Sequence, residues 1–83
     1  MEKTGDEPAI IYTGHSRTRM AERRISEDDV RQIVMNYDTR RPASPRHGAS
    51  PTEILIGWCR WRRLRVYIVR GSDPLAVKTA AWE

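Results

Sequence analysis

The sequence predicts one small α+β domain, in which two helices pack on one face of a mainly antiparallel sheet. Three observations predict it: a length of 83 residues, an apolar repeat of helical period in the first half, and a two-residue alternation from residue 52 onward. A chain of this length buries only about 60 to 65% of its unfolded surface, so it forms a single thin core. The expected order of elements is β-α-α-β-β-β over residues 9–83.

The first part of the chain is expected to hold a disordered leader, a strand and a helix. Residues 1–8 are polar, which favours disorder. The β-branched and aromatic run at 9–13 predicts a strand. A helix follows from about His15, and we expect Met20 and Ala21 on its core-facing side.

The second helix has the clearest signals in the sequence. Ser26 predicts its N-cap, and Asp29 stands at the third helical position of a capping box. The helix is expected over about 27–37. Its apolar residues recur at i, i+3, i+4 and i+7 and are Val30, Ile33, Val34 and Tyr37. This face is therefore expected to be core.

The segment 38–51 contains three prolines and a glycine, which predicts a loop without regular structure. We expect a solvated, disordered connection. The alternative is a functional loop that closes over an anionic ligand with its basic residues, which are Arg40, Arg41, Arg46 and His47.

Three alternating strands are predicted from residue 52, joined by hairpins at 59–62 and 71–74. They form an antiparallel meander. The residues expected to face the helices are aliphatic, namely Ile54, Ile56, Leu64, Val66, Ile68, Leu75 and Val77. By parity, Arg65, Tyr67 and Lys78 lie on the opposite face.

The charge pattern favours an anionic partner. The net charge is +4 although residues 1–8 contribute −2, and thirteen of the fifteen basic residues are arginine. The planar fork of arginine binds phosphate or carboxylate at two points. Nucleic acid is the first partner to consider, and the alternatives are an acidic protein partner or a basic surface without a ligand.

Cysteine and histidine usage excludes several classes of site. The single cysteine, Cys59, cannot form an intramolecular disulfide, which indicates a reducing, cytoplasmic compartment. No apolar run is long enough to span a membrane. The only histidines, His15 and His47, show no metal-ligand spacing, so no metal or other cofactor is expected.

His15, Arg19 and Arg23 follow one another at i, i+4 and i+8, so a helix places them on one face. In metal-independent RNA cleavage, His15 would accept the proton of the ribose 2′-hydroxyl and the two arginines would hold the phosphate. Tyr67 or Lys78 would serve as acid or orienting group. The alternative for His15 is a helix-capping role.

Two further groups interleave aromatic rings with cations, as nucleic-acid-binding surfaces do. They are Arg65, Tyr67 and Lys78 on the strands and Arg60, Trp61 and Arg62 in the first hairpin. The alternatives are a solvated sheet face and an exposed charged turn.

The chain resembles the domain of unknown function 4258 family, whose members begin with the pattern H-A-x-x-R-M-x-x-R-x-I-S. The matching residues are His15, Arg19, Met20, Arg23, Ile25 and Ser26, and residues 77–82 resemble the family's last strand. The resemblance implies a compact fold similar to the RelE, ParE and BrnT toxins, a superfamily that includes ribonucleases. It implies functional positions at His15, Arg19, Arg23 and Thr79. The chain departs from the pattern at Ser16, where alanine is usual, and at Arg24, which is often glycine.

The sequence therefore predicts an RNA-binding, RelE-like domain, and a metal-independent endoribonuclease toxin with an acidic antitoxin as its partner. Two alternatives remain open: a non-enzymatic nucleic-acid-binding module and a protein-interaction domain. The oligomeric state is left open.

Overall fold

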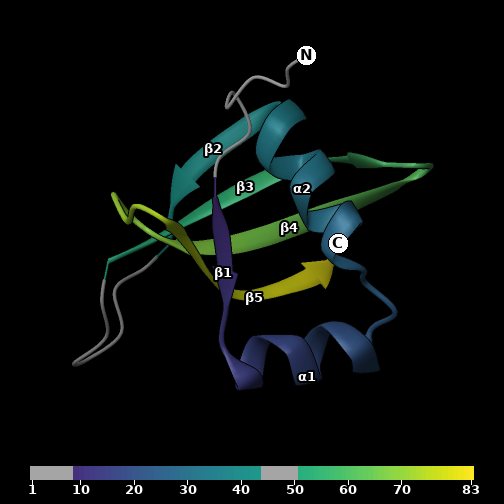
Figure 1. Ribbon diagram of the computed structural model, residues 1–83. Helices are drawn as coiled ribbons and strands as arrows, with labels where there is room; N and C mark the ends of the chain where they lie inside the picture. Colours follow the sequence, from purple (N-terminus) through teal and green to yellow (C-terminus); the bar gives the residue numbers. More distant parts are fainter. Residues whose placement is uncertain (1–8, 44–50) are drawn as a thin grey trace, which may run out of the picture.

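The structure is a computed structural model that describes residues 9–43 and 51–83. The predicted leader at 1–8, together with Arg46 and His47 of the predicted loop, lies outside these residues. The elements are β1 (Ile10–Tyr12), α1 (Gly14–Glu22), α2 (Glu27–Asn36), β2 (Thr39–Pro42), β3 (Thr52–Cys59), β4 (Arg62–Val69) and β5 (Leu75–Trp82) (Figure 1).

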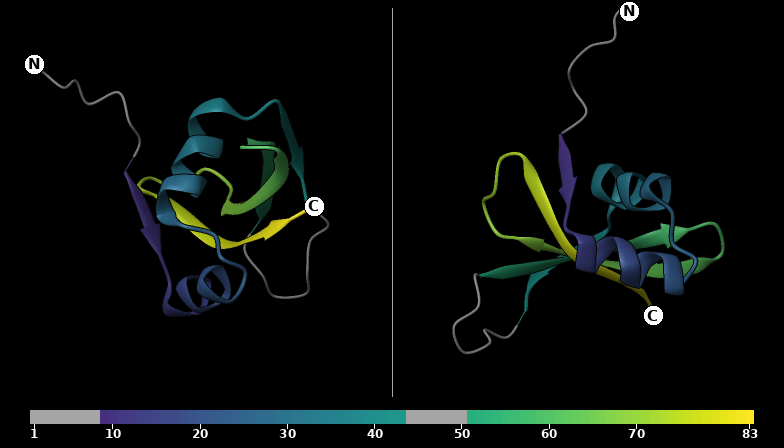
Figure 2. Two further views of the ribbon diagram at one scale, coloured as in Figure 1. Left: turned by 90° about the vertical axis from the view of Figure 1, so that its right-hand side faces the viewer. Right: turned by 60° about the horizontal axis from the view of Figure 1, so that its bottom comes forward.

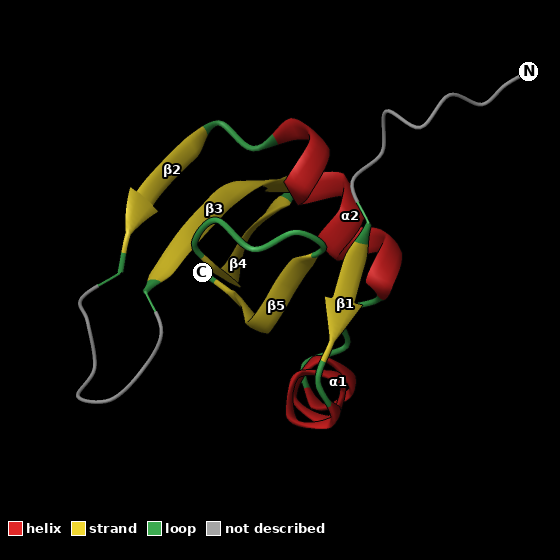
Figure 3. Ribbon diagram, turned by 60° about the vertical axis from the view of Figure 1, so that its left-hand side comes forward, coloured by secondary structure: helices red, strands yellow, loops and turns green. Residues whose placement is uncertain are grey.

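All five strands belong to one sheet of order β1-β5-β4-β3-β2. The predicted meander of β3, β4 and β5 is confirmed, because both neighbouring pairs are antiparallel. β1 pairs with β5 in the parallel direction, which the sequence did not predict. Figure 3 shows β1 and β2 at opposite edges of the sheet. The predicted α+β class and the mainly antiparallel sheet are confirmed.

The prediction that 38–51 holds no regular element is wrong at β2, which pairs with β3 from Thr39 opposite Ile56 to Pro42 opposite Glu53. An edge strand needs hydrogen bonds on one side only, so it tolerates a proline that an inner strand would exclude. An edge strand of this kind is difficult to predict from sequence, because it contains charged residues and proline at positions where an inner strand has apolar residues.

Both helices begin at capping boxes. At α1, the Thr13 side chain accepts a hydrogen bond from the Ser16 backbone at 3.0 Å, and the Ser16 side chain accepts one from the Thr13 backbone at 2.9 Å. This pairing explains the departure from the family pattern at Ser16, which is completely buried. At α2, Ser26 is the N-cap with Asp29 at the third position, as predicted.

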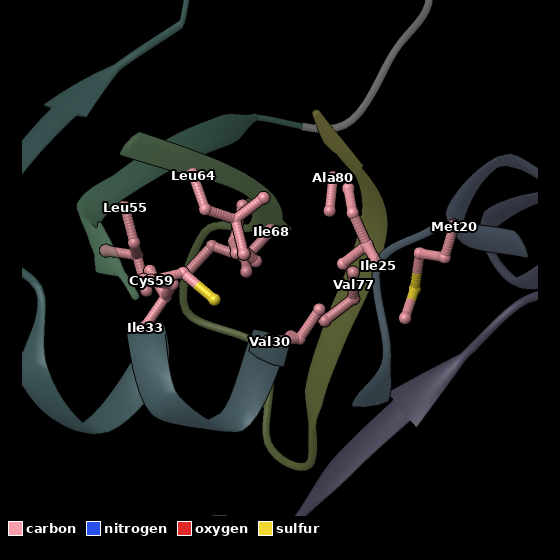
Figure 4. Close-up of a cluster of buried hydrophobic side chains, with 11 residues drawn as sticks. Met20, Ile25, Val30, Ile33, Leu55, Cys59, Leu64, Ile68, Val77 and Ala80 are labelled. Atoms are coloured by element: carbon pink, nitrogen blue, oxygen red, sulfur yellow. The ribbon is translucent and has the colours of Figure 1, made fainter. Parts of the chain in front are cut away.

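The core joins both helices to the sheet. Val30 and Ile33 of α2 are completely buried and belong to one cluster with Leu55, Cys59 and Val77; in Figure 4, Ile33 lies by Cys59 and Val30 by Val77. Met20 of α1 is buried as predicted, whereas Ala21 is exposed. α2 packs on β3 and β4, and α1 lies along β5 (Figure 2). Neither helix is long and apolar enough to cross a membrane in the part of the chain described.

The prediction that Ile54 and Ile56 face the helices is wrong. They pair with Tyr67 and Arg65, so they lie on the outer face, where they are nevertheless buried. Their neighbours Leu55 and Cys59 face the core instead. β3 is apolar on both faces, so alternation alone cannot choose between them.

Gly57 shows what fixes the orientation of β3. A Cβ atom at Gly57 would lie 3.2 Å from the Tyr37 Cα and 3.4 Å from the Ile33 side chain. The end of α2 therefore approaches the backbone of β3 closely at the one position without a side chain.

Candidate nucleic-acid interface

His15 and Arg19 lie on the solvent-facing side of α1. Ser16 and Met20, one position further on, are buried, while His15 and Arg19 are both exposed. The guanidinium of Arg19 lies 3.4 Å from the carboxylate of Glu22. Exposed pairs of this kind contribute little, so Arg19 remains accessible to a ligand.

Arg23 is the C-cap of α1, and its backbone N–H still donates to the Arg19 carbonyl at 3.1 Å. The Nη1 atom of Arg23 donates to the Ala80 carbonyl at 2.8 Å and lies 3.3 Å from the Thr79 hydroxyl. The fold thus brings the guanidinium of Arg23 to Thr79, a residue 56 positions away.

Arg65, Tyr67 and Lys78 lie on the outer sheet face, as predicted. Arg65 Nη1 lies 3.4 Å from the Tyr67 hydroxyl, and Lys78 Nζ donates to the Thr52 hydroxyl at 2.7 Å. Lys78 is the extra residue where the β4–β5 register shifts, since Tyr67 pairs with Thr79 and Ile68 with Val77.

The positive charge of this outer face is partly neutralised. Arg63 forms an ion pair with Asp38 at 2.6 Å, and Glu83 lies 3.6 Å from Arg63 and 3.9 Å from Arg65. The hydrogen bond from Arg63 holds the pKa of Asp38 below its usual value. An incoming phosphate would have to compete with these carboxylates.

The hairpin residues belong to a different surface. A pocket of about 280 Å³ opens where the β3–β4 hairpin meets the corner between α1 and α2 and the end of β5. The left view in Figure 2 looks onto this end of the molecule. We call it the arginine–tryptophan pocket, and its lining residues are Arg23, Arg24, Cys59, Arg60, Trp61, Arg62 and Trp82.

Four guanidinium groups and two indoles therefore surround one hollow. None of the lining residues is acidic in the described part of the chain. Arg23 donates its hydrogen bonds to the Ala80 carbonyl and the Thr79 hydroxyl. Because both acceptors are neutral, these bonds do not compensate the positive charge of Arg23. The pocket is more cationic than the outer face, where carboxylates accompany the arginines.

The two indoles have different surroundings. Trp82 Nε1 donates to the Arg23 carbonyl at 2.7 Å, and the guanidinium carbon of Arg62 lies 4.4 Å from the centroid of the Trp82 ring. Trp82 is thus fixed in orientation by a hydrogen bond and a cation–π contact. The Trp61 side chain is 80% exposed at the rim of the pocket.

Asp29 connects the start of α2 to the β3–β4 hairpin. Its carboxylate accepts from the Ser26 backbone at 3.0 Å and lies 3.4 Å from both Cys59 Sγ and Arg60 Nη2. Burial acts to raise the pKa of the Asp29 carboxyl. Hydrogen bonds from Ser26 and Cys59, helped by the charge of Arg60, outweigh that effect and hold this pKa below its usual value.

Cys59 is a structural residue. It is 3% exposed, and burial, followed by its contact with Asp29, raises the pKa of its thiol. A protonated, buried thiol is a poor nucleophile.

Two lining residues adopt a backbone conformation that L-residues rarely take. Arg24 has φ 58° and Arg60 has φ 61°. The left-handed region is sparsely populated by residues other than glycine and asparagine, and it costs on the order of 1 kcal/mol. Both conformations are needed to make the tight turns that border the pocket, one between the helices and one in the hairpin.

Sequence reasoning found the hairpin group but missed Arg24 and Trp82 as its partners. Both residues entered the sequence analysis only through the family pattern, Arg24 as a departure from it and Trp82 as part of the last strand. The signal available was the number of arginines near each turn. It could not show that segments from three parts of the chain meet at one hollow.

The fold and the pocket define a small α+β domain whose cationic, tryptophan-lined surface suits an anionic ligand. The chain belongs to the family described as Domain of unknown function (DUF4258), whose family model matches residues 12–82. The match includes every residue of the pocket and the four positions that the resemblance implied. Comparison with curated proteins and with solved structures gives no match.

Proposed function

We propose that this domain binds RNA, and that unpaired nucleotides of the RNA contact the arginine–tryptophan pocket. The observation that carries the proposal is the composition of the pocket: four guanidiniums and two indoles line it, and no carboxylate does so in the described chain. Guanidinium groups hold phosphate oxygens through paired, charge-assisted hydrogen bonds. Indoles stack on bases that are not already stacked in a duplex.

The contacts of Trp82 and Trp61 suggest separate tasks for the two rings. Trp82 is held by the Arg23 carbonyl and covered by Arg62, so it positions the Arg62 fork. Trp61 stands exposed and is available to stack on a base. Preference for RNA over DNA rests on the resemblance to RelE-like proteins, a superfamily that includes ribonucleases.

Replacing Trp61 with alanine should weaken binding of a short unstructured RNA by about tenfold, because base stacking on one aromatic side chain is worth roughly 1–3 kcal/mol. Fluorescence anisotropy at several salt concentrations measures both affinity and salt dependence. The logarithmic salt slope should be about −0.7 for each phosphate contacted in a single strand.

Trp58→Ala is the matched control. Trp58 is also exposed, at 60%, but it lies on the outer face, where Arg63 stacks on its ring at 5.1 Å. This variant should bind RNA like the wild type. Equal losses in both variants, or no loss in either, would place the RNA elsewhere and remove the pocket from the proposal.

A second candidate is metal-independent cleavage of the bound RNA. The contact between Arg23 and Thr79 favours it, because it unites two of the four positions that the resemblance implies. In this scheme the exposed His15 accepts the 2′-hydroxyl proton, while Arg19 and Arg23 stabilise the charge that develops on the phosphorus oxygens. Tyr67 or Lys78 supplies the acid or orienting group.

Digestion of labelled RNA in the presence of a metal chelator tests this candidate. We expect the wild type to cleave and His15→Ala to lose at least about 100-fold in rate, the usual contribution of a general base. Equal cleavage by both proteins, or none by either at high concentration, removes the catalytic proposal and leaves RNA binding standing.

The toxin hypothesis also predicts an acidic antitoxin. The cationic pocket supports such a partner, because a carboxylate-rich segment would find the same guanidinium forks as a phosphate. Partner and RNA would then compete for one surface.

A further inference from the structure

We infer that the arginine–tryptophan pocket receives a single nucleotide bearing a phosphate monoester, either the phosphorylated end of an RNA strand or a free nucleoside monophosphate. This inference rests on the proposed function and narrows it from RNA in general to a terminal phosphate. Three features of the pocket carry it: its size, its surplus of positive charge, and the arrangement of its two indoles.

The size of the pocket suits one nucleotide. At about 280 Å³ it lies just below the range of roughly 300–1,000 Å³ that is typical of small-molecule sites, so it has room for one nucleotide at most. Proteins that hold the interior of a single strand use a charged groove that follows the backbone over several nucleotides. Here the guanidiniums converge on one hollow from the helix corner and the hairpin, with no second row of cations along a track among the lining residues described.

The charge of the pocket suits a dianion. Asp29, which is buried behind the pocket, compensates part of the charge of Arg60, whose Nη2 atom lies 3.4 Å from its carboxylate. The same carboxylate also accepts hydrogen bonds from Ser26 and Cys59. In the described part of the chain, Arg60 pairs with Asp29, whereas neither Arg24 nor Arg62 forms an ion pair with a carboxylate. An internal phosphodiester brings one negative charge, whereas a monoester brings about −1.5 to −2 and three acceptor oxygens.

The position of the tryptophans suits a base next to that phosphate. The guanidinium carbon of Arg62 lies over the Trp82 ring, 4.4 Å from its centroid, and a guanidinium in such a cation–π contact can still donate hydrogen bonds to a phosphate. Trp61 stands between Arg60 and Arg62 in sequence and is 80% exposed. A phosphate held by the forks would therefore carry its base within reach of the Trp61 ring.

Calorimetric titration with unlabelled oligoribonucleotides of one sequence tests the inference. The three ligands carry a 5′-phosphate, a 3′-phosphate or no terminal phosphate. We expect one phosphorylated form to bind about tenfold more tightly than the unphosphorylated form, the equivalent of one additional charge-assisted hydrogen bond. Adenosine monophosphate should compete with that oligonucleotide, and adenosine should not.

Two variants locate the effect. Arg24→Gln removes an exposed charge from the rim of the pocket and should abolish the preference for the phosphorylated end. Arg70→Gln, an exposed residue after β4, should leave the preference unchanged. Inorganic phosphate should compete less well than adenosine monophosphate, because it offers nothing to Trp61.

The outcomes separate this inference from the proposed function. Equal affinity for all three oligonucleotides, with RNA binding intact, overturns terminal recognition and leaves RNA binding in place. No binding of any oligonucleotide overturns both. Competition by inorganic phosphate as strong as that by adenosine monophosphate overturns the role given to the base.

Discussion

Replacing Arg24 and Arg62 together with glutamate should lower the affinity for RNA by at least about 100-fold. The change removes two guanidiniums from the pocket and places two carboxylates where phosphate is expected to bind. Like charges brought together at an interface cost several kcal/mol, and each 1.4 kcal/mol corresponds to a tenfold change in affinity. Fluorescence anisotropy with unstructured RNA measures the loss.

The control must carry the same net charge. Arg41→Glu combined with Arg70→Glu meets this condition, because both arginines are exposed and neither lines the pocket. This control should lose far less affinity than the pocket variant. Comparable losses in the two variants would show that the affinity for RNA depends on the overall charge of the domain and not on the pocket. Circular dichroism would confirm that both variants are folded.

Asp29→Ala should lower the free energy of unfolding by about 2–3 kcal/mol. Alanine removes half of the capping box at the start of α2 and the buried acceptor for Cys59 and Arg60, and each such interaction contributes roughly 1 kcal/mol. Urea denaturation measures the change. Asp28→Ala is the matched control, because the Asp28 side chain is 90% exposed and its ion pair with Arg31 lies at the surface.

The pH dependence of the free energy of unfolding is an independent test of how much the Asp29 carboxylate stabilises the fold. Its pKa is lower in the folded protein than in the unfolded chain, so its contribution is present above the ordinary value of 3.8 and is lost as pH falls through the folded value. Between about pH 5 and pH 2, the wild type should lose more unfolding free energy than Asp29→Asn. Asp38 has a pKa shifted in the same direction but is common to both proteins. Parallel curves would contradict the role given to Asp29.

Local sequence determined the helices and the strands of the meander. The capping residues Ser26 and Asp29 act within one turn of α2, and the spacing of Val30 and Ile33 defines its buried face. Interactions between residues this close are encoded in a short stretch of chain, so they can be predicted from it. The excess of arginine similarly showed a cationic composition without any knowledge of the fold.

Tertiary structure decided which residues share a site. The sequence placed Arg23 at helical spacing from Arg19, but it could not show that the Arg23 guanidinium contacts Thr79 and Ala80 on β5. The helix corner and the hairpin tip, more than thirty residues apart, border one pocket with Trp82. Periodicity describes neighbours along the chain and contains no information about such distant pairs.

The sequence by itself determined the α+β class, α2 and the cationic composition of this protein. Only the tertiary structure decided the face of β3, the edge strand β2 and the arginine–tryptophan pocket. The physical reason is that these features depend on long-range pairing. The apolar side chains of β3 fit either face of a sheet, and it is the close approach of α2 to Gly57 that puts Leu55 inside and Ile54 outside.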